Sequence, residues 1–195
     1  MGDVCGRGAK AATTTALVRH TARAVAALLD DPVDVVRAVD KALHDRDHHR
    51  DNGMTLGYGH LEPVADGLAV HLVRAGHTPP LLLDDQHAVG TVEAAGGLLG
   101  VGIPPGLKAR RLTLRPGASL LLYTDGITEC RAAGAEQYGE TRLAKALAAA
   151  PPRSTAAGIV RIVAVDVRGF AGGRDVEDDQ AAHVITAGEP APRRG

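Results

Sequence analysis

Helical patterns occupy the two ends of this sequence and strand patterns cluster in its middle, and this order limits the folds open to the chain. Apolar residues recur at helical spacing over 9–29 and 33–43, and again over 139–150 and 154–170. Runs typical of strands lie at 54–61, 68–74, 81–83, 109–114, 119–123 and 181–185. A doubly wound parallel sheet would need regular alternation of strand and helix, which this order lacks. The pattern therefore predicts an α+β domain with mainly antiparallel sheet.

Local signals mark several boundaries of these elements. Asp31 suits the cap of the second helix, with Pro32 at its first position, and Ser154 is a candidate cap for the last helix. The stretch 62–67 is predicted to connect the two strands of a hairpin. The stretch 96–106 holds five glycines and two prolines, so we expect a loop there.

Composition narrows the class of protein. With 195 residues, of which 45% are hydrophobic, the chain is large enough for one domain with a buried core. We expect the folded domain to cover 1–187 and a disordered tail to cover 188–195. A net charge of −1 gives no reason to expect nucleic-acid binding. Two cysteines make no disulfide framework, and the sequence shows neither a signal peptide nor a span long enough for a membrane, so a cytoplasmic protein is expected.

Three short acidic motifs are the candidate site. They contain Asp3 near the N-terminus, Asp125 in the middle of the chain, and Asp178 with Asp179 near the C-terminus. Each lies next to a strand-like run or at a turn, where carboxylates from distant parts of a chain can meet. Carboxylate oxygens favour Mg²⁺ or Mn²⁺ over zinc or copper, and two such ions can activate water to attack a phosphate ester. The competing interpretations are turn and capping roles for Asp3 and Asp125, and a solvated acidic loop for Asp178.

Five segments, in order and at similar gaps, make the chain resemble a known family. The run Leu-Leu-Leu-Tyr-Thr-Asp-Gly-Ile-Thr-Glu at 120–129 is the most distinctive of them. The others are 2–8, 75–80, 138–143 and 178–180. Together they resemble the metal-dependent protein serine/threonine phosphatases of the PPM family, in the SpoIIE-like bacterial branch. The resemblance implies an antiparallel β-sandwich flanked by helices and two Mn²⁺ or Mg²⁺ ions as cofactors.

The resemblance also implies a role for individual residues. Asp3 corresponds to the aspartate that bridges both metals, and Val4 to a residue whose backbone carbonyl reaches a metal. Asp125 corresponds to a ligand of one metal, and Asp178 to the ligand that closes the site. Asp179 is an alternative ligand, because a shift of one residue is easily mistaken. The catalytic group would be a metal-activated water, with no protein nucleophile.

Two further residues each have a functional and a structural interpretation. Arg7 is a candidate for binding phosphate oxygens, with a solvent-exposed arginine as an equal interpretation. His77 would suit a general acid near neutral pH, but a structural histidine bonded to backbone is the favoured interpretation.

The sequence departs from the family pattern in two places. It starts at the first metal motif, so the fold is expected to lack the first strands, and Asp3 is expected to lie on a free N-terminus instead of the end of a central strand. Ala181 stands close to where the family commonly has threonine, which implies weaker support for the metal ligands.

The implied activity is hydrolysis of phosphoserine or phosphothreonine in a protein, often an anti-sigma-factor antagonist in a partner-switching circuit. An alternative is an inactive fragment or pseudophosphatase that serves as a protein-binding module. A third interpretation, a two-metal phosphodiesterase on small molecules, would want a basic pocket, and the loop 96–106 carries no positive charge.

Overall fold

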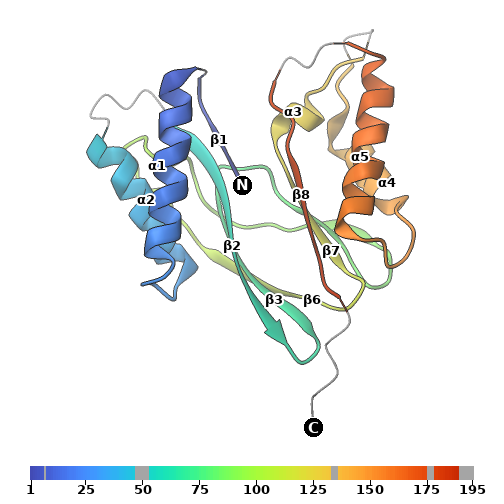
Figure 1. Ribbon diagram of the computed structural model, residues 1–195, viewed down its shortest axis with the longest axis horizontal. Coiled ribbons are helices and arrows are strands. Elements are labelled where there is room, and N and C mark those ends of the chain that lie inside the picture. Colours follow the sequence, from blue (N-terminus) through green and yellow to red (C-terminus); the bar gives the residue numbers. More distant parts are fainter. Residues whose placement is uncertain (7, 47–52, 133–135, 175–177, 189–195) are drawn as a thin grey trace. The chain divides into compact units, whose positions relative to one another are not determined.

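A computed structural model describes residues 1–6, 8–46, 53–132, 136–174 and 178–188 (Figure 1). The helices are α1 (Ala9–Val25), α2 (Pro32–Arg46), α3 (Asp125–Thr128), α4 (Gly139–Ala148) and α5 (Ala156–Ala171). The strands are β1 (Gly2–Val4), β2 (Met54–Val64), β3 (Gly67–Ala75), β4 (Leu81–Leu83), β5 (Val89–Thr91), β6 (Ala109–Leu114), β7 (Ser119–Tyr123) and β8 (Ala182–Thr186). They form two four-stranded sheets, ordered β1-β2-β3-β6 and β5-β4-β7-β8.

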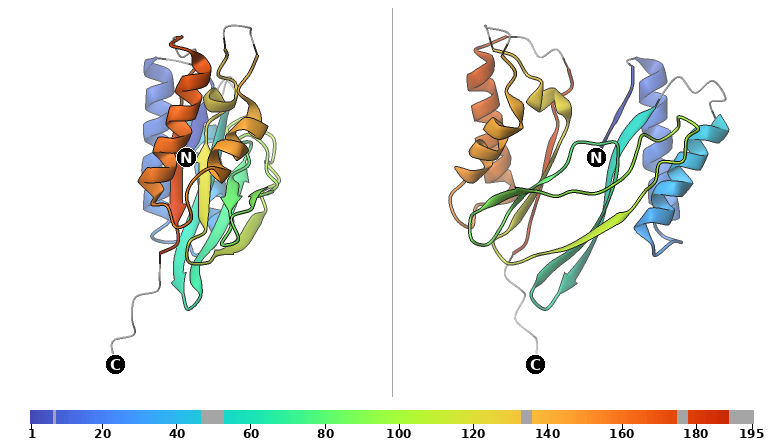
Figure 2. Two further views of the ribbon diagram at one scale, coloured as in Figure 1. Left: turned by 90° about the vertical axis from the view of Figure 1, so that its right-hand side faces the viewer. Right: turned by 180° about the vertical axis from the view of Figure 1, so that it is seen from behind.

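The chain divides into two compact units. The first unit comprises 1–61, 70–77 and 93–112, and the second comprises 62–69, 78–92 and 113–195. In the first unit α1 and α2 lie side by side (Figures 1 and 2). Their apolar faces share a core with β2, β3 and the loop before β6; its buried residues are Val18, Val33, Val36, Val39, Leu43, Met54, Leu56, Val73, Ala75, Leu99 and Leu107.

Helix α2 begins where its sequence signals place it. The Asp31 carboxylate accepts the backbone N–H of Val33 at 2.8 Å, and Pro32 occupies the first helical position, where no backbone donor is needed. Its apolar residues then recur at spacings of three and four, and they are the ones that are buried. The predicted cap and start of this helix are therefore confirmed.

The sheet of the second unit is antiparallel throughout. β4 pairs with β5 and with β7, and β7 pairs with β8, so that Leu121 lies opposite Val184 and Tyr123 opposite Ala182. All five residues of β7 are buried, as expected for an interior strand. The prediction of an α+β fold with antiparallel sheets and flanking helices is thus confirmed.

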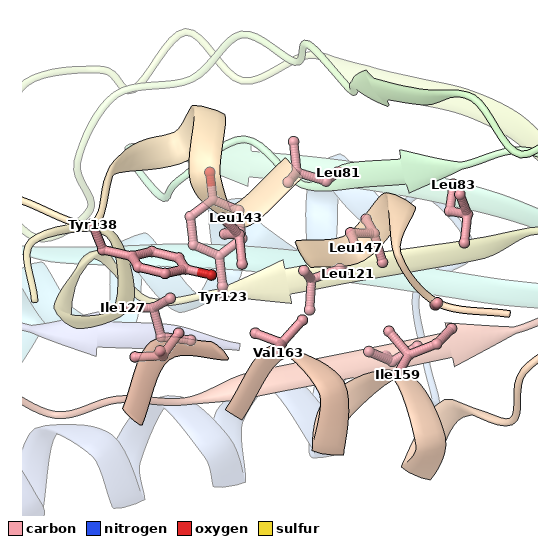
Figure 3. Packing of buried hydrophobic residues seen from close by; sticks show 13 residues of the cluster. Leu81, Leu83, Leu121, Tyr123, Ile127, Tyr138, Leu143, Leu147, Ile159 and Val163 are labelled. Carbon is pink, nitrogen blue, oxygen red and sulfur yellow. The ribbon is translucent and has the colours of Figure 1, made fainter. Parts of the chain in front are cut away.

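The core of the second unit is built almost entirely from aliphatic side chains. Figure 3 shows Leu121 of β7 among residues of α4 and α5, including Leu143, Ile159 and Val163. Tyr123 and Tyr138 are its two buried tyrosines. Each fully buried leucine or isoleucine contributes about 1.5–3 kcal/mol by leaving water, which offsets the scarcity of large aromatic anchors.

Several boundaries differ from those expected. The strands β2 and β3 run to Val64 and from Gly67, which leaves only Ala65 and Asp66 as the turn. Gly67 follows with a φ of 141°, a conformation that glycine adopts readily. Helix α5 is capped by Thr155, whose hydroxyl accepts the N–H of Gly158 at 3.1 Å, and not by Ser154. The Ser154 hydroxyl instead donates to the carbonyl of Pro151 at 2.6 Å. No helix within the described ranges has the length and apolar character needed to span a bilayer.

Tyr138 should make the stability of the fold depend on alkaline pH. Its hydroxyl donates to a carboxylate oxygen of Asp166 at 2.6 Å, and burial, then that hydrogen bond, raise its pKa above the usual 10.0. The folded state therefore keeps a proton that the unfolded chain releases, so the contribution of Tyr138 is complete below pH 10 and is lost as the pH rises further. We expect Tyr138→Phe to lower the free energy of unfolding by about 1 kcal/mol at pH 8. That deficit should shrink above pH 10, measured by urea unfolding; a deficit that stays constant from pH 8 to 11 would contradict the assignment.

Candidate metal centre

The acidic residues predicted from the sequence are divided between the two units. Asp3 lies on β1 in the first unit, while Asp125 begins α3 and Asp178 and Asp179 precede β8 in the second. Arg7, the predicted phosphate-binding residue, lies outside the described residues. Within the part of the chain that the structure describes, no three His, Cys, Asp or Glu residues gather closely enough to hold a metal ion.

Asp3 is held in an edge strand. The expectation of a free N-terminus is wrong, whereas the expectation that Asp3 does not lie in a central strand agrees with this position. β1 pairs antiparallel with β2, with Asp3 opposite Thr55 and Val4 opposite Met54. The pairing continues beyond both ends of β1, because Gly57 N–H donates to the Met1 carbonyl at 2.8 Å and Cys5 N–H donates to the Gly53 carbonyl at 3.1 Å. It is this pairing with β2, and not the composition of three residues, that makes β1 a strand. Asp3 and Val4 thus have a fixed backbone.

His77 is linked to β1 through the side chain of Thr55. The backbone N–H of Asp3 donates to the Thr55 hydroxyl at 3.2 Å, and that hydroxyl lies 2.8 Å from His77 Nδ1. Since the hydroxyl oxygen accepts from Asp3, its own proton is available for the imidazole nitrogen. His77 is buried, at 3% exposure, which fits the structural interpretation, and the contact of its Nδ1 is with the side chain of Thr55.

Asp125 lies where β7 ends and α3 begins. Its carboxylate is exposed, and one oxygen accepts the N–H of Gly126 at 3.1 Å. That contact fixes the rotation of the side chain and leaves its second oxygen available to a ligand.

Asp178 and Asp179 lie in the loop that leads into β8. Both are exposed, and the Asp178 carboxylate accepts the N–H of Asp179 at 2.9 Å. The Asp125 carboxylate likewise accepts the N–H of the residue that follows it, Gly126. The backbone carbonyl of Asp179 is already engaged, because it accepts the Thr124 hydroxyl at 2.8 Å. Asp178 and Asp179 both remain candidates for the closing ligand.

The two acidic loops of the second unit are fastened to each other by side chains. The Thr124 hydroxyl donates to Asp179 and also accepts the N–H of Ala181 at 2.9 Å. Gln180 reaches the other way, since its amide donates to the carbonyl of Gly126 at 3.0 Å. These three hydrogen bonds, which we call the Thr124–Gln180 clasp, bring motifs more than 50 residues apart in sequence to one end of the sheet.

Gly126 makes that approach possible. An added Cβ there would lie 2.6 Å from the Asp179 carbonyl oxygen and 3.3 Å from the carbonyl carbon of Asp178. Both neighbours are backbone atoms, which cannot rotate out of the way. The glycine of the Asp-Gly motif is therefore needed for the close packing of the two loops, beyond any preference for a turn.

The donor atoms fit a hard divalent cation. Asp125, Asp178 and Asp179 offer carboxylate oxygens, which Mg²⁺ and Mn²⁺ prefer. Among the ion pairs found within the described residues, none involves these three aspartates. The chemistry of the donors thus agrees with the predicted metals.

Sequence patterns did not identify Thr124, Gly126 and Gln180 as site residues. Their place in the sequence could have identified them, because Thr124 and Gly126 flank Asp125 and Gln180 follows Asp179. None of the three has a proposed ligand role. Ala181 was expected to give weaker support to the metal ligands because it lacks a hydroxyl. Its backbone N–H nevertheless donates to the hydroxyl of Thr124, so the residue takes part in connecting the two loops.

Comparisons with solved structures match nearly the whole chain to phosphatase domains. The RsbU and RsbW domains of Rv1364c from Mycobacterium tuberculosis superpose with a TM-score of 0.76 at 26% identity, covering 98% of this chain and 51% of that one. The SiaA-PP2C domain of Pseudomonas aeruginosa gives 0.76 at 18% identity, covering 95% and 73%. The catalytic domain of the serine/threonine phosphatase PstP, in complex with two manganese ions, gives 0.63 at 18% identity, covering 96% and 86%. This chain spans about half the length of the Rv1364c structure.

The fold is that of the PP2C-type, or PPM, protein phosphatase domains. Within that class, the sequence model described as Stage II sporulation protein E (SpoIIE) matches residues 1–187. The chain belongs to the SpoIIE family.

Proposed function

We propose that this chain is a metal-dependent phosphatase that releases phosphate from phosphoserine or phosphothreonine in a protein. The observation that carries the proposal is the clasped pair of acidic loops at the common end of β7 and β8, within a chain whose SpoIIE match covers residues 1–187. The PstP domain, of the same fold, was solved with two manganese ions, which supports Mn²⁺ as a cofactor here.

The proposed roles follow from where the chain holds its oxygen donors. Asp125 and Asp178, with Asp179 as the alternative, would hold a divalent cation in the second unit. Asp3 and the carbonyl of Val4 are proposed metal ligands on the first unit. When bound, divalent cations activate water for attack on phosphorus and neutralise charge on the phosphoryl oxygens. The N–H groups of Gly126 and Asp179 orient the Asp125 and Asp178 carboxylates before any ion arrives, which lowers the cost of ordering them.

We propose a small phosphoprotein of the anti-sigma-factor antagonist type as the substrate. The similarity to the structure of the RsbU and RsbW domains of Rv1364c supports a role with such partner-switching proteins. A cytoplasmic location stays a prediction from sequence.

The first test is Mn²⁺-dependent release of phosphate by the intact chain from a phosphoserine protein and from a phosphodiester, bis(p-nitrophenyl) phosphate. We expect release from the monoester protein with Mn²⁺ and none after chelation. Cleavage of the diester alone would indicate a phosphodiesterase instead. Binding of the phosphoprotein without turnover at any Mn²⁺ concentration would indicate a binding module and overturn the proposed function.

A further inference from the structure

Thr124 connects the two acidic loops and is not itself one of the proposed metal ligands. Its side chain is 5% exposed and its backbone continues the β7–β8 pairing, with the N–H of Thr124 donating to the carbonyl of Ala181 at 3.0 Å. Within the same pair of residues, the N–H of Ala181 donates to the Thr124 hydroxyl. The hydroxyl proton then goes to the carbonyl of Asp179.

This single hydroxyl thus uses both its donor and its acceptor capacity on the loop that carries Asp178 and Asp179. On its other side Thr124 is covalently joined to Asp125. A change in how the hydroxyl is held therefore changes the separation of the carboxylates on the two loops. Gln180, which is half-buried, adds the second connection through Gly126.

We propose that Thr124 is a positioning residue of the metal site, whose hydroxyl sets the separation of the two acidic loops and thereby the affinity for divalent cation. The inference rests on the proposed function, since it assigns the acidic loops to a metal. The positioning role does not follow from burial alone. Any hydrogen-bond partners would satisfy a buried hydroxyl, whereas both partners of the Thr124 hydroxyl belong to the loop that carries Asp178 and Asp179. Metal sites tolerate displacements of only about 0.5 Å in their ligands.

The test compares Thr124→Val, which keeps the shape but loses the hydroxyl, with Thr124→Ser, which keeps the hydroxyl. The dissociation constant for Mn²⁺ is measured by calorimetry on the full chain, and stability without metal by urea unfolding. We expect the valine variant to bind Mn²⁺ about 10–100-fold more weakly, the usual cost of losing a group that orients a metal ligand, and the serine variant to bind within a few-fold of wild type. Gln180→Ala should weaken binding in the same direction.

Ile159→Val is the control for destabilisation, because it removes one methyl group from the core of the second unit and Ile159 takes no part in the Thr124–Gln180 clasp. It should lower stability and leave Mn²⁺ affinity unchanged. Valine and serine variants with equal Mn²⁺ affinity would overturn the positioning role, as would an equal loss of affinity in Ile159→Val. A wild-type chain that binds no Mn²⁺ would instead refute the proposed function, and this inference with it.

Discussion

Replacing Asp125 with asparagine is expected to reduce Mn²⁺-dependent phosphate release at least about 100-fold. Asparagine has the same shape, and its side-chain oxygen can still accept the N–H of Gly126, so the loop should keep its conformation. What is lost is the negative charge and one metal-binding oxygen. Removing groups that only orient ligands costs about 10–100-fold, so a ligand itself should cost at least the upper value. Phosphate release and Mn²⁺ binding should fall together, with the free energy of unfolding within about 0.5 kcal/mol of wild type.

Asp66→Asn is the matched control for that variant. Asp66 lies in the turn between β2 and β3, where Asn-Gly is as acceptable as Asp-Gly, so the same chemical change should leave activity intact. An Asp125→Asn chain that releases phosphate within tenfold of the wild-type rate would remove Asp125 from the proposed ligand set.

Gly126→Ala is expected to impair both the site and the fold. The new methyl group would lie 2.6 Å from the Asp179 carbonyl oxygen, where ordinary contacts start at 3.4 Å, so the two loops must separate by more than half an ångström. That displacement exceeds the tolerance of about 0.5 Å for ligands of a built site. We expect Mn²⁺ affinity to fall about 10-fold or more, and overpacking to cost about 1–3 kcal/mol in urea unfolding.

The matched control for Gly126→Ala is Gly169→Ala in α5, where an added Cβ meets nothing within 4 Å. Because alanine is the better helix former, that variant should gain up to about 1 kcal/mol and bind Mn²⁺ normally. Wild-type Mn²⁺ affinity in Gly126→Ala would show that the loops can separate without consequence, and the close approach would then have no functional role.

The longer elements of the fold were predictable because each carries its own pattern. Helix α2 has a cap, a first-turn proline and periodic valines, all within one stretch of sequence. The missed elements β1, β5 and α3 are three or four residues long. Strand β5, for example, is Val-Gly-Thr, and only its pairing with β4 makes it a strand. Such short elements depend on tertiary partners that local propensity does not reveal.

The candidate site divides in the same way. Asp3, Asp125 and Asp178 could be proposed because a resemblance of motifs assigns them, and the structure shows how their backbones are held. The Thr124–Gln180 clasp could not be predicted, because its hydrogen bonds join residues 54 to 57 positions apart and leave no periodic trace. Its residues become meaningful only when β7 and β8 are known to be neighbours.

The pairing of β8 with the edge of β7 also sets the order in which the site can assemble during synthesis. Asp125 leaves the ribosome long before β8, which follows it by more than 50 residues, so the nascent chain carries one acidic loop without the other. Since contacts between distant segments form late in folding, the clasp closes only after the last strand has joined the sheet. A cation that needs both loops would therefore bind only after β8 has paired with β7, which would tie metal binding to the completion of this sheet.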